Sequence, residues 1–226
     1  QKYLSNPGDS TDWDIEPLPE EELRVTATGQ LSTSLESLET VYSLNLKEAE
    51  QKMQALEKLR QQPREFYRSS ILGAAKQLSG YREPDDYHKP VFTGRFQKEG
   101  YVIEKYFVKG SGDYVLPYLL FVPERQNGKG VICVHSKGKS AVADSGYAEA
   151  FLQKGVTVLA PDLLGIGEVG QGNYKGDSFI DDISYGIWHL AVLTGKSIVG
   201  LQAEDISRLV GLLKEAYQMK EIQGWS

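Results

Sequence analysis

Residues 131–168 read VICVHSKGKSAVADSGYAEAFLQKGVTVLAPDLLGIGE, and their pattern gives the clearest indication of the fold. It opens with a short apolar run, residues 131–134, which is typical of a strand buried on both faces. The segment 141–154 predicts a helix that ends at Gly155, and residues 156–160 form a second buried apolar run. A strand, a helix and a strand in direct succession predict a βαβ unit, so at least part of the sheet is expected to be parallel.

The flanking sequence extends this unit on both sides. Residues 101–108 and 114–122 are rich in aromatic and β-branched residues, and a glycine-containing turn separates them, which predicts an antiparallel hairpin. Beyond the second buried run, a glycine-rich loop covers residues 165–176. The segments 179–193 and 197–218 are then expected to be helices, because their apolar residues recur at helical spacing.

The N-terminal part of the chain differs in composition from the rest. Residues 1–40 hold nine acidic and two basic residues, and we expect an acidic linker or extended arm there, with a short strand near 23–27. This arm is either a solvated tail or wrapped on the domain. Residues 41–95 are expected to form a helical segment, with one helix over Asn45–Gln61 that its first residue caps and a second over Pro63–Leu78.

Composition excludes several classes of protein. The chain has 226 residues, of which 40% are hydrophobic and 25% charged, as is usual for globular domains. Its formal net charge of -6 gives no basic footprint for nucleic acid. The single cysteine, Cys133, excludes an internal disulfide and a cysteine zinc cluster, and no histidine has a partner at ligand spacing, so no metal is expected. No apolar run approaches the roughly 20 residues that a membrane-spanning helix needs.

Two short motifs resemble phosphate-binding loops without the required context. Gly-Lys-Ser occurs at 138–140 and at 195–197, but neither copy has the glycine that a P-loop needs five positions earlier. Residues 165–170 spell G-x-G-x-x-G, yet residues 161–164 separate this motif from the strand, and more glycines follow it instead of a helix. A nucleotide-binding domain is therefore the weaker alternative, and no cofactor is expected.

The loop that begins at His135 directly follows the first buried strand. A loop at the carboxyl end of a parallel strand is where α/β sheets place their ligands. The segment His135–Gly138 is therefore a candidate site, and the alternative interpretation is an ordinary turn at the end of a strand.

The order of these features resembles the front half of an α/β-hydrolase, and more closely the acetylxylan-esterase-like branch of that fold. The strand that ends in His-x-x-Gly is followed by a helix and by a strand that leads into Asp162–Glu168, which is similar to the D-x-x-G-x-G-E loop of this branch. Further similar segments are Gly195–Gly200, followed by a long helix with Asp205, and Thr26–Gln30 in the leader. The resemblance covers roughly residues 20–223.

The resemblance implies both a fold and a site. Residues 96–226 are expected to form an incomplete α/β-hydrolase fold, with a mixed, mostly parallel sheet and flanking helices, preceded by the helical segment and the acidic leader. The backbone amides of Ser136 or Lys137 are expected to contribute to an oxyanion hole. The loop residues expected near the site are His135, Gly138, Asp162, Gly165, Gly167 and Glu168, of which Asp162 and Glu168 are structural.

The sequence contains no G-x-S-x-G nucleophile elbow. The resemblance therefore implies that the nucleophile, the acid and the catalytic His lie beyond Ser226 and that this chain holds no catalytic side chain. The helix that ends near residue 218 is expected to be the last element. Val131–Val134 would then be an exposed, apolar edge strand that a missing C-terminal half, a second chain, a helix or the N-terminal arm must cover.

The leading functional hypothesis is a fragment of a serine carboxylic-ester hydrolase that deacetylates carbohydrate esters of the xylan type and is inactive by itself. The parent protein would act on an acylated carbohydrate or a small ester, without nucleic acid, cofactor or membrane span. The alternative is a non-catalytic, degenerate hydrolase that binds a partner or a glycan. Localisation stays open; Gln1 and the usual export of polysaccharide-directed esterases point, by analogy, to a periplasmic or secreted protein.

Overall fold

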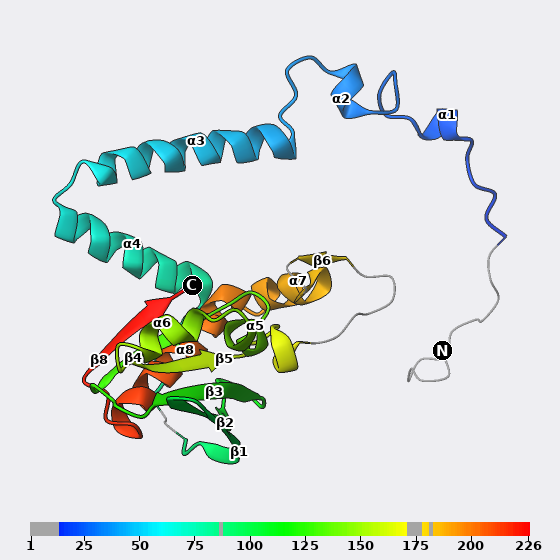
Figure 1. Cartoon of the computed structure of the whole chain (residues 1–226). Coiled ribbons are helices and arrows are strands. Elements are labelled where there is room, and N and C mark those ends of the chain that lie inside the picture. Colours follow the sequence, from blue (N-terminus) through cyan, green and yellow to red (C-terminus); the bar gives the residue numbers. More distant parts are fainter. Residues whose placement is uncertain (1–13, 86–87, 171–177, 181–182) are drawn as a thin grey trace, which may run out of the picture. The chain divides into compact units, whose positions relative to one another are not determined.

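A computed structural model describes residues 14–85, 88–170, 178–180 and 183–226. The chain divides into two compact units, and the boundary falls between Tyr67 and Arg68. Each unit is described by itself, and Figure 1 shows the elements of both.

The described part of the first unit, residues 14–67, contains helices α1, α2 and α3 and the first turn of α4 (Arg64–Ser79). Helices α1 (Glu20–Leu23) and α2 (Leu31–Ser34) are short, and α3 spans Val41–Arg60. The sequence placed the start of α3 at Asn45, which is wrong, because Thr40 caps the helix: its hydroxyl accepts the Ser43 amide at 3.1 Å, and the Ser43 hydroxyl accepts the Thr40 amide at 2.8 Å. The strand predicted near 23–27 is also wrong, since α1 ends there and a turn follows.

The second unit is built on one six-stranded sheet with the order β1-β2-β3-β5-β4-β8 (Figure 1). The β1–β2, β2–β3 and β3–β5 pairs are antiparallel, whereas the β5–β4 and β4–β8 pairs are parallel. The expected mixed sheet of an incomplete α/β fold is confirmed, but the detail that the sheet is mostly parallel is wrong. The strands are β1 (Val91–Lys98), β2 (Tyr101–Lys109), β3 (Val115–Pro123), β4 (Lys129–Cys133), β5 (Thr157–Pro161) and β8 (Glu221–Trp225).

Strand β8 corrects the expectation that the long helix is the last element of the chain. It pairs in parallel with β4, with Lys129 opposite Glu221 and Cys133 opposite Trp225. The Val134 amide donates to the Trp225 carbonyl at 2.9 Å and extends the pairing past the end of β4. The expected exposed edge over Val131–Val134 is therefore wrong, because β8 covers it, and the sheet ends at β8 instead.

The core lies on both faces of this sheet, as alternation along the strands requires. On one face, Ile132 and Leu159 pack with Leu209 and Leu213 of α8 (Ile198–Glu215). On the other face, the neighbouring strand residues pack under α5 (Lys139–Asp144) and α6 (Tyr147–Leu152). Figure 1 shows α8 on the side of the sheet opposite α5 and α6.

Two of the predicted helices are interrupted. A single helix was expected over 141–154, but Gly146 takes a left-handed conformation, φ +73°, and separates α5 from α6. The predicted helix over 179–193 begins only at α7 (Tyr185–Leu193), after the short strands β6 (Phe179–Ile180) and β7 (Ile183–Ser184). Helix α4 (Arg64–Ser79) agrees closely with the prediction.

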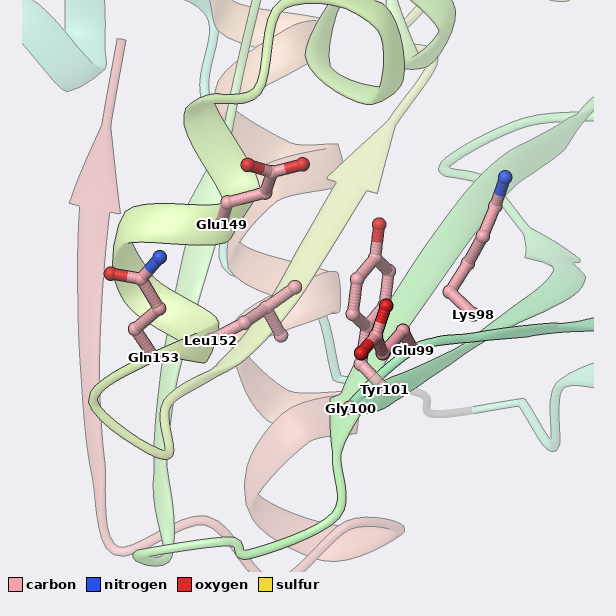
Figure 2. A pocket seen from close by; sticks show the side chains of 7 residues that line it. All are labelled: Lys98, Glu99, Gly100, Tyr101, Glu149, Leu152 and Gln153. Atoms are coloured by element: carbon pink, nitrogen blue, oxygen red, sulfur yellow. The ribbon is translucent and has the colours of Figure 1, made fainter.

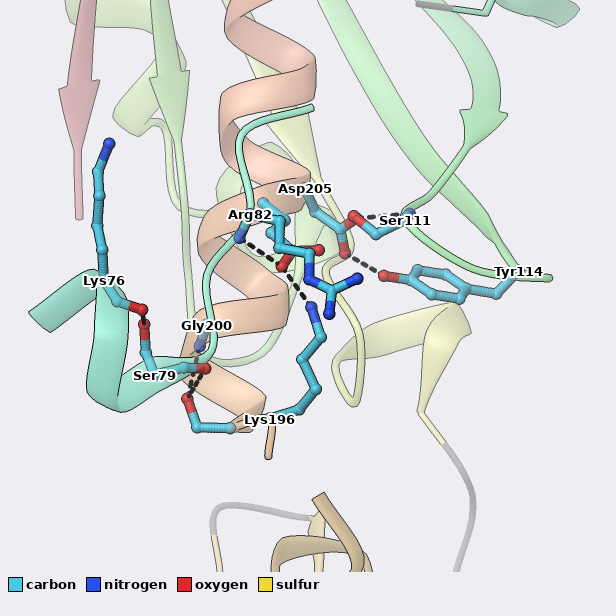
Figure 3. Close-up of polar contacts among 10 residues, drawn as sticks. Lys76, Ser79, Arg82, Ser111, Tyr114, Lys196, Gly200 and Asp205 are labelled. Carbon is cyan, nitrogen blue, oxygen red and sulfur yellow. Dashed lines mark hydrogen bonds and ion pairs between the residues drawn. The ribbon is translucent and has the colours of Figure 1, made fainter. Parts of the chain in front are cut away.

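Polar contacts hold the N-terminal half of α8 against the end of α4 and the segment that follows it (Figure 3). Ser197 caps α8 by accepting the Gly200 amide at 2.9 Å, and its hydroxyl donates to the Ser79 carbonyl at 3.1 Å. Glu204, almost fully buried, accepts the Arg82 amide at 2.8 Å and the Lys196 ammonium at 2.7 Å. The start of α8 is thereby fixed in position.

Asp205 joins α8 to the loop between β2 and β3. Its fully buried carboxylate accepts hydrogen bonds from the Tyr114 hydroxyl at 2.8 Å and from the Ser111 amide at 3.2 Å. Burial raises the pKa of Asp205, and these hydrogen bonds together with the Arg208 charge oppose that rise. Asp205, which the resemblance singled out, therefore has a structural place in this fold.

Gly200 is required by close packing, so we expect Gly200→Ala to destabilise the second unit. A Cβ at this position would lie 2.1 Å from the Ser79 carbonyl oxygen. Overpacking of this kind lowers the free energy of unfolding by about 1–3 kcal/mol, which urea unfolding would measure. Gly73→Ala, in the middle of α4, is the matched control, because a Cβ there meets nothing within 4 Å. It should raise helix stability by about 0.5–1 kcal/mol, and equal effects of the two variants would contradict this packing account.

Candidate functional site

Three segments meet where the parallel strands end. Because β5, β4 and β8 run in the same direction, their carboxyl ends share one edge of the sheet, which is where open α/β sheets bind ligands. The loop His135–Gly138 follows β4, the loop Asp162–Glu168 follows β5, and Ser226 follows β8. The structure thus brings the two predicted loops together and adds a serine beside them.

Asp162 connects the two loops through a buried carboxylate that is 2% exposed. One oxygen, Oδ1, accepts the Lys139 backbone amide at 2.7 Å, and the other, Oδ2, accepts the Glu168 backbone amide at 2.9 Å. The Lys139 ammonium forms an ion pair with the same carboxylate and a second one with Glu168 at 2.9 Å. These contacts tie the loop after β5 to the start of α5, and the structural role of Asp162 and Glu168 stays a prediction.

Glycines line the space that the Asp162 carboxylate fills. Gly138 has φ +78°, and a Cβ there would lie 2.3 Å from Asp162 Oδ1. Gly167 has φ +56°, and a Cβ there would lie 2.3 Å from Asp162 Cγ. Gly165 has φ +84°, and a Cβ there would lie 2.6 Å from Ile183 Cδ1. Positive φ and close approach both require glycine at these positions.

The His135–Gly138 loop is a tight turn in which the amides of Lys137 and Gly138 are engaged and the Ser136 amide is not. The Gly138 amide donates to the His135 carbonyl at 2.9 Å and closes the turn. The Lys137 amide donates to His135 Nδ1 at 3.0 Å and is therefore engaged. The Ser136 amide, in an exposed residue, has no acceptor within the part of the chain that the structure describes. Of the two predicted oxyanion-hole amides, Ser136 is thus the one free to bind a ligand.

Ser226 is the residue that sequence reasoning missed. Cys133 lies opposite Trp225, so Ser226 follows on beside Val134, next to the His135–Gly138 loop. Gly224, Trp225 and Ser226 match the first three positions of G-x-S-x-G, a motif in which the serine follows a strand. A search for all five positions overlooks this partial match, whereas a search for the first three positions alone would have found it.

A groove of about 650 Å³ runs beside β8, between this strand and α8. Its apolar wall comes from Ile206 and Val210 of α8 and from Ile222 of β8, and Ser226 lies along it. The groove therefore has an apolar lining and lies beside β8, the edge strand of the sheet.

A cysteine nucleophile and a metal site are both poorly supported by the described residues. Cys133 is fully buried, and burial raises the pKa of its thiol to about 11, so it is a poor nucleophile. Among the described residues, no group of three or more His, Cys, Asp or Glu side chains is placed to hold a metal ion. None of the described helices has the length and apolar character needed to cross a bilayer.

The G-x-G-x-x-G segment uses most of its own backbone amides. The amides of Gly165, Ile166, Val169 and Gly170 donate to carbonyl groups within the same loop, and the Glu168 amide donates to Asp162. A phosphate at a glycine-rich loop needs such amides free and a helix N-terminus behind them. Here the motif itself contains a single 3-10 turn, η1 (Gly167–Val169), and its engaged amides argue against phosphate binding at this loop.

Comparison with known proteins identifies the fold but no family. No family model matches the sequence, and no curated protein matches it. A Bacteroides fragilis protein assigned as an acetyl xylan esterase has the same fold, with a TM-score of 0.59, 16% identity, and coverage of 92% of this chain and 59% of that one. The chain thus shares its fold with this neighbour, as the resemblance predicted, and spans 59% of the neighbour's length.

Two further solved structures are similar over shorter parts. Acetyl xylan esterase 1 from a Thermoanaerobacterium species is 17% identical, with a TM-score of 0.43 and coverage of 75% of this chain and 55% of that one. A cold-adapted esterase from an Arctic intertidal metagenomic library is 20% identical, with a TM-score of 0.42 and coverage of 60% and 54%.

Asp162 and Glu168 share one lysine but differ in burial, which makes them a matched pair for mutation. Asp162→Asn should lower the free energy of unfolding by about 3 kcal/mol, because it leaves the largely buried Lys139 ammonium without its buried partner. Glu168→Gln should cost less than about 1 kcal/mol, since the Glu168 side chain is 71% exposed. Chemical denaturation of both variants measures this difference, and equal losses would show that Asp162 does not hold the loops together.

Proposed function

We propose that the chain is the N-terminal part of a serine carboxylic-ester hydrolase, in which Ser226 is the nucleophile and acetyl groups on carbohydrate are the substrate. The observation that carries the proposal is the position of Ser226 at the end of β8, beside the turn that holds the free Ser136 amide. The acetyl xylan esterase assignment of a protein with the same fold supports the substrate class. A longer chain is part of the proposal, because this chain spans 59% of that neighbour.

The proposed chemistry needs a nucleophile and an oxyanion hole at adjacent strand ends. The Ser226 hydroxyl would attack the ester carbonyl, and a tetrahedral intermediate with a negatively charged oxygen would form. The Ser136 amide would donate to that oxygen, together with the amide of the residue that follows the nucleophile. Donors fixed in this way stabilise the transition state because they need no reorganisation as the charge develops.

The general base and the acid that orients it belong to the part of the protein beyond Ser226 in this proposal. His135 does not fit the role of base, because its Nδ1 accepts the Lys137 amide and holds the turn. Residues 1–226 alone are therefore expected to give no ester turnover above background. Activity of this exact chain would refute that part of the proposal.

The open edge of β8 is the proposed contact for the remainder of the protein. The sequence led us to expect pairing along Val131–Val134, but β8 occupies that edge. The free side of β8 and the apolar groove beside α8 offer both unpaired backbone groups and apolar surface. We therefore assign the missing C-terminal half, rather than a second chain, to this edge.

Removal of the Ser226 hydroxyl tests the nucleophile. In the full-length protein, Ser226→Ala should lower kcat for 4-nitrophenyl acetate and for acetylated xylan by at least about 10⁴-fold, because no acyl-enzyme can form. Ser140→Ala, at an exposed serine of α5, is the matched control and should leave kcat unchanged. Loss of activity in both variants, or in neither, would argue against Ser226. A full-length wild-type protein without any turnover would favour the alternative, a non-catalytic binding module.

The Ser136 amide can be removed without removing the turn. Ser136 occupies the first central position of the His135–Gly138 turn, where proline is favoured and lacks only the N–H. Ser136→Pro should lower kcat in the full-length protein by about 10²–10³-fold, the usual cost of one oxyanion-hole donor. Ser136→Ala keeps the amide and should keep near-wild-type activity. Equal activity of the two variants would assign the oxyanion contact elsewhere.

A further inference from the structure

A second hollow lies at the end of the sheet opposite to Ser226. Tyr101 is opposite Pro123 in the β2–β3 pair, and Phe121 is opposite Val158 near the start of β5. The turn between β1 and β2 therefore lies near the amino ends of the parallel strands. A cavity of about 480 Å³ opens between this turn and α6. It is separate from the proposed catalytic edge, and its properties do not depend on the proposed function.

The lining of this hollow combines an aromatic ring with a polar rim. Figure 2 shows Tyr101 upright at the start of β2, with Leu152 and Glu149 reaching toward it from α6. Lys98 and Glu99 stand on the hairpin side. Leu152 is buried and lies beside the partly buried ring of Tyr101, so the bottom of the cavity is apolar.

The polar groups of this rim are not used to hold the fold together. Within the described parts of the chain, the side chains of Lys98, Glu99, Glu149 and Gln153 and the Tyr101 hydroxyl form no hydrogen bond or ion pair with another residue. They can therefore donate and accept hydrogen bonds to a ligand without breaking internal contacts. Carboxylate, amide, ammonium and hydroxyl groups around one ring offer both donors and acceptors.

The hollow continues into a second one and forms a trough. A neighbouring cavity of about 540 Å³ shares Gly100, Leu152 and Gln153 with the first and runs on beneath the end of β3. Gly100 contributes no side chain to block the passage, and a Cβ there would meet nothing within 4 Å. A long, open trough fits an extended chain molecule better than a compact one.

We propose that this trough, centred on Tyr101, binds a neutral carbohydrate chain at a site remote from the catalytic edge. A sugar ring presents C–H groups that pack on an aromatic face and hydroxyl groups that need both donors and acceptors, which this lining supplies. Over the whole trough the charges balance, which favours a neutral ligand over an ionic one: the cations are Lys98, Arg125 and Lys154, and the carboxylates are Glu99, Glu124 and Glu149. Such a site would hold a polysaccharide on the protein independently of cleavage.

Binding can be measured on the 226-residue chain itself, without any turnover. Amide chemical shifts would be followed during titration with xylotetraose, with tetralysine as a cationic probe and sulfate as an anionic one. We expect xylotetraose to shift amides at residues 98–101 and 149–153. Tyr101→Leu, which keeps an apolar contact and removes the ring, should weaken this binding by roughly fivefold to tenfold. Tyr185→Leu, at an exposed tyrosine of α7, is the matched control and should leave it unchanged.

Three outcomes would overturn the proposal. The first is the absence of shifts with xylotetraose in the folded wild-type chain. The second is equal binding by the Tyr101→Leu variant, with its fold confirmed by the same spectra. The third is a stronger response of the trough to tetralysine or to sulfate than to xylotetraose, which would assign it to a charged ligand. None of these outcomes bears on Ser226, so this site and the proposed catalytic function can fail separately.

Discussion

The Asp162 carboxylate joins the two loops that follow β4 and β5, and the shape of the candidate site depends on it. It accepts the amides at the start of α5 and at Glu168, and the Lys139 ammonium compensates its charge in a buried place. The adjacent glycines leave room for this carboxylate, since a Cβ on Gly138 or Gly167 would collide with it. The turn that presents the Ser136 amide is therefore set by a residue of the neighbouring strand, and not by its own sequence alone.

Strand β8 brings Ser226 to the two loops. It covers β4, removes the apolar edge that would otherwise be exposed, and carries Ser226 to the edge where the two loops meet. Because a parallel neighbour fixes the register, the end of β8 lies next to the start of the His135–Gly138 turn. A serine hydroxyl and a backbone donor can thus be placed side by side by strand pairing, without direct contact between their side chains.

Local patterns predicted the elements well, and long-range contacts account for what they missed. The βαβ unit and the hairpin follow from apolar runs and turn residues, and the structure has both. The short strand Glu221–Trp225 has little apolar character of its own and gains its conformation from pairing with β4, so periodicity could not reveal it. The role of Asp162 likewise depends on residues more than 20 positions away in the chain. The tyrosine trough could not be found from sequence, because it joins a hairpin turn to a helix.

Covalent labelling would show whether Ser226 is the nucleophile of an ester hydrolase, as we propose. The protein from its native source would be treated with a fluorophosphonate probe, digested, and its adduct located by peptide mass spectrometry. We predict a single adduct on Ser226 within a chain longer than 226 residues. An adduct on another serine, or a protein that takes up no probe while it remains folded, would contradict the account.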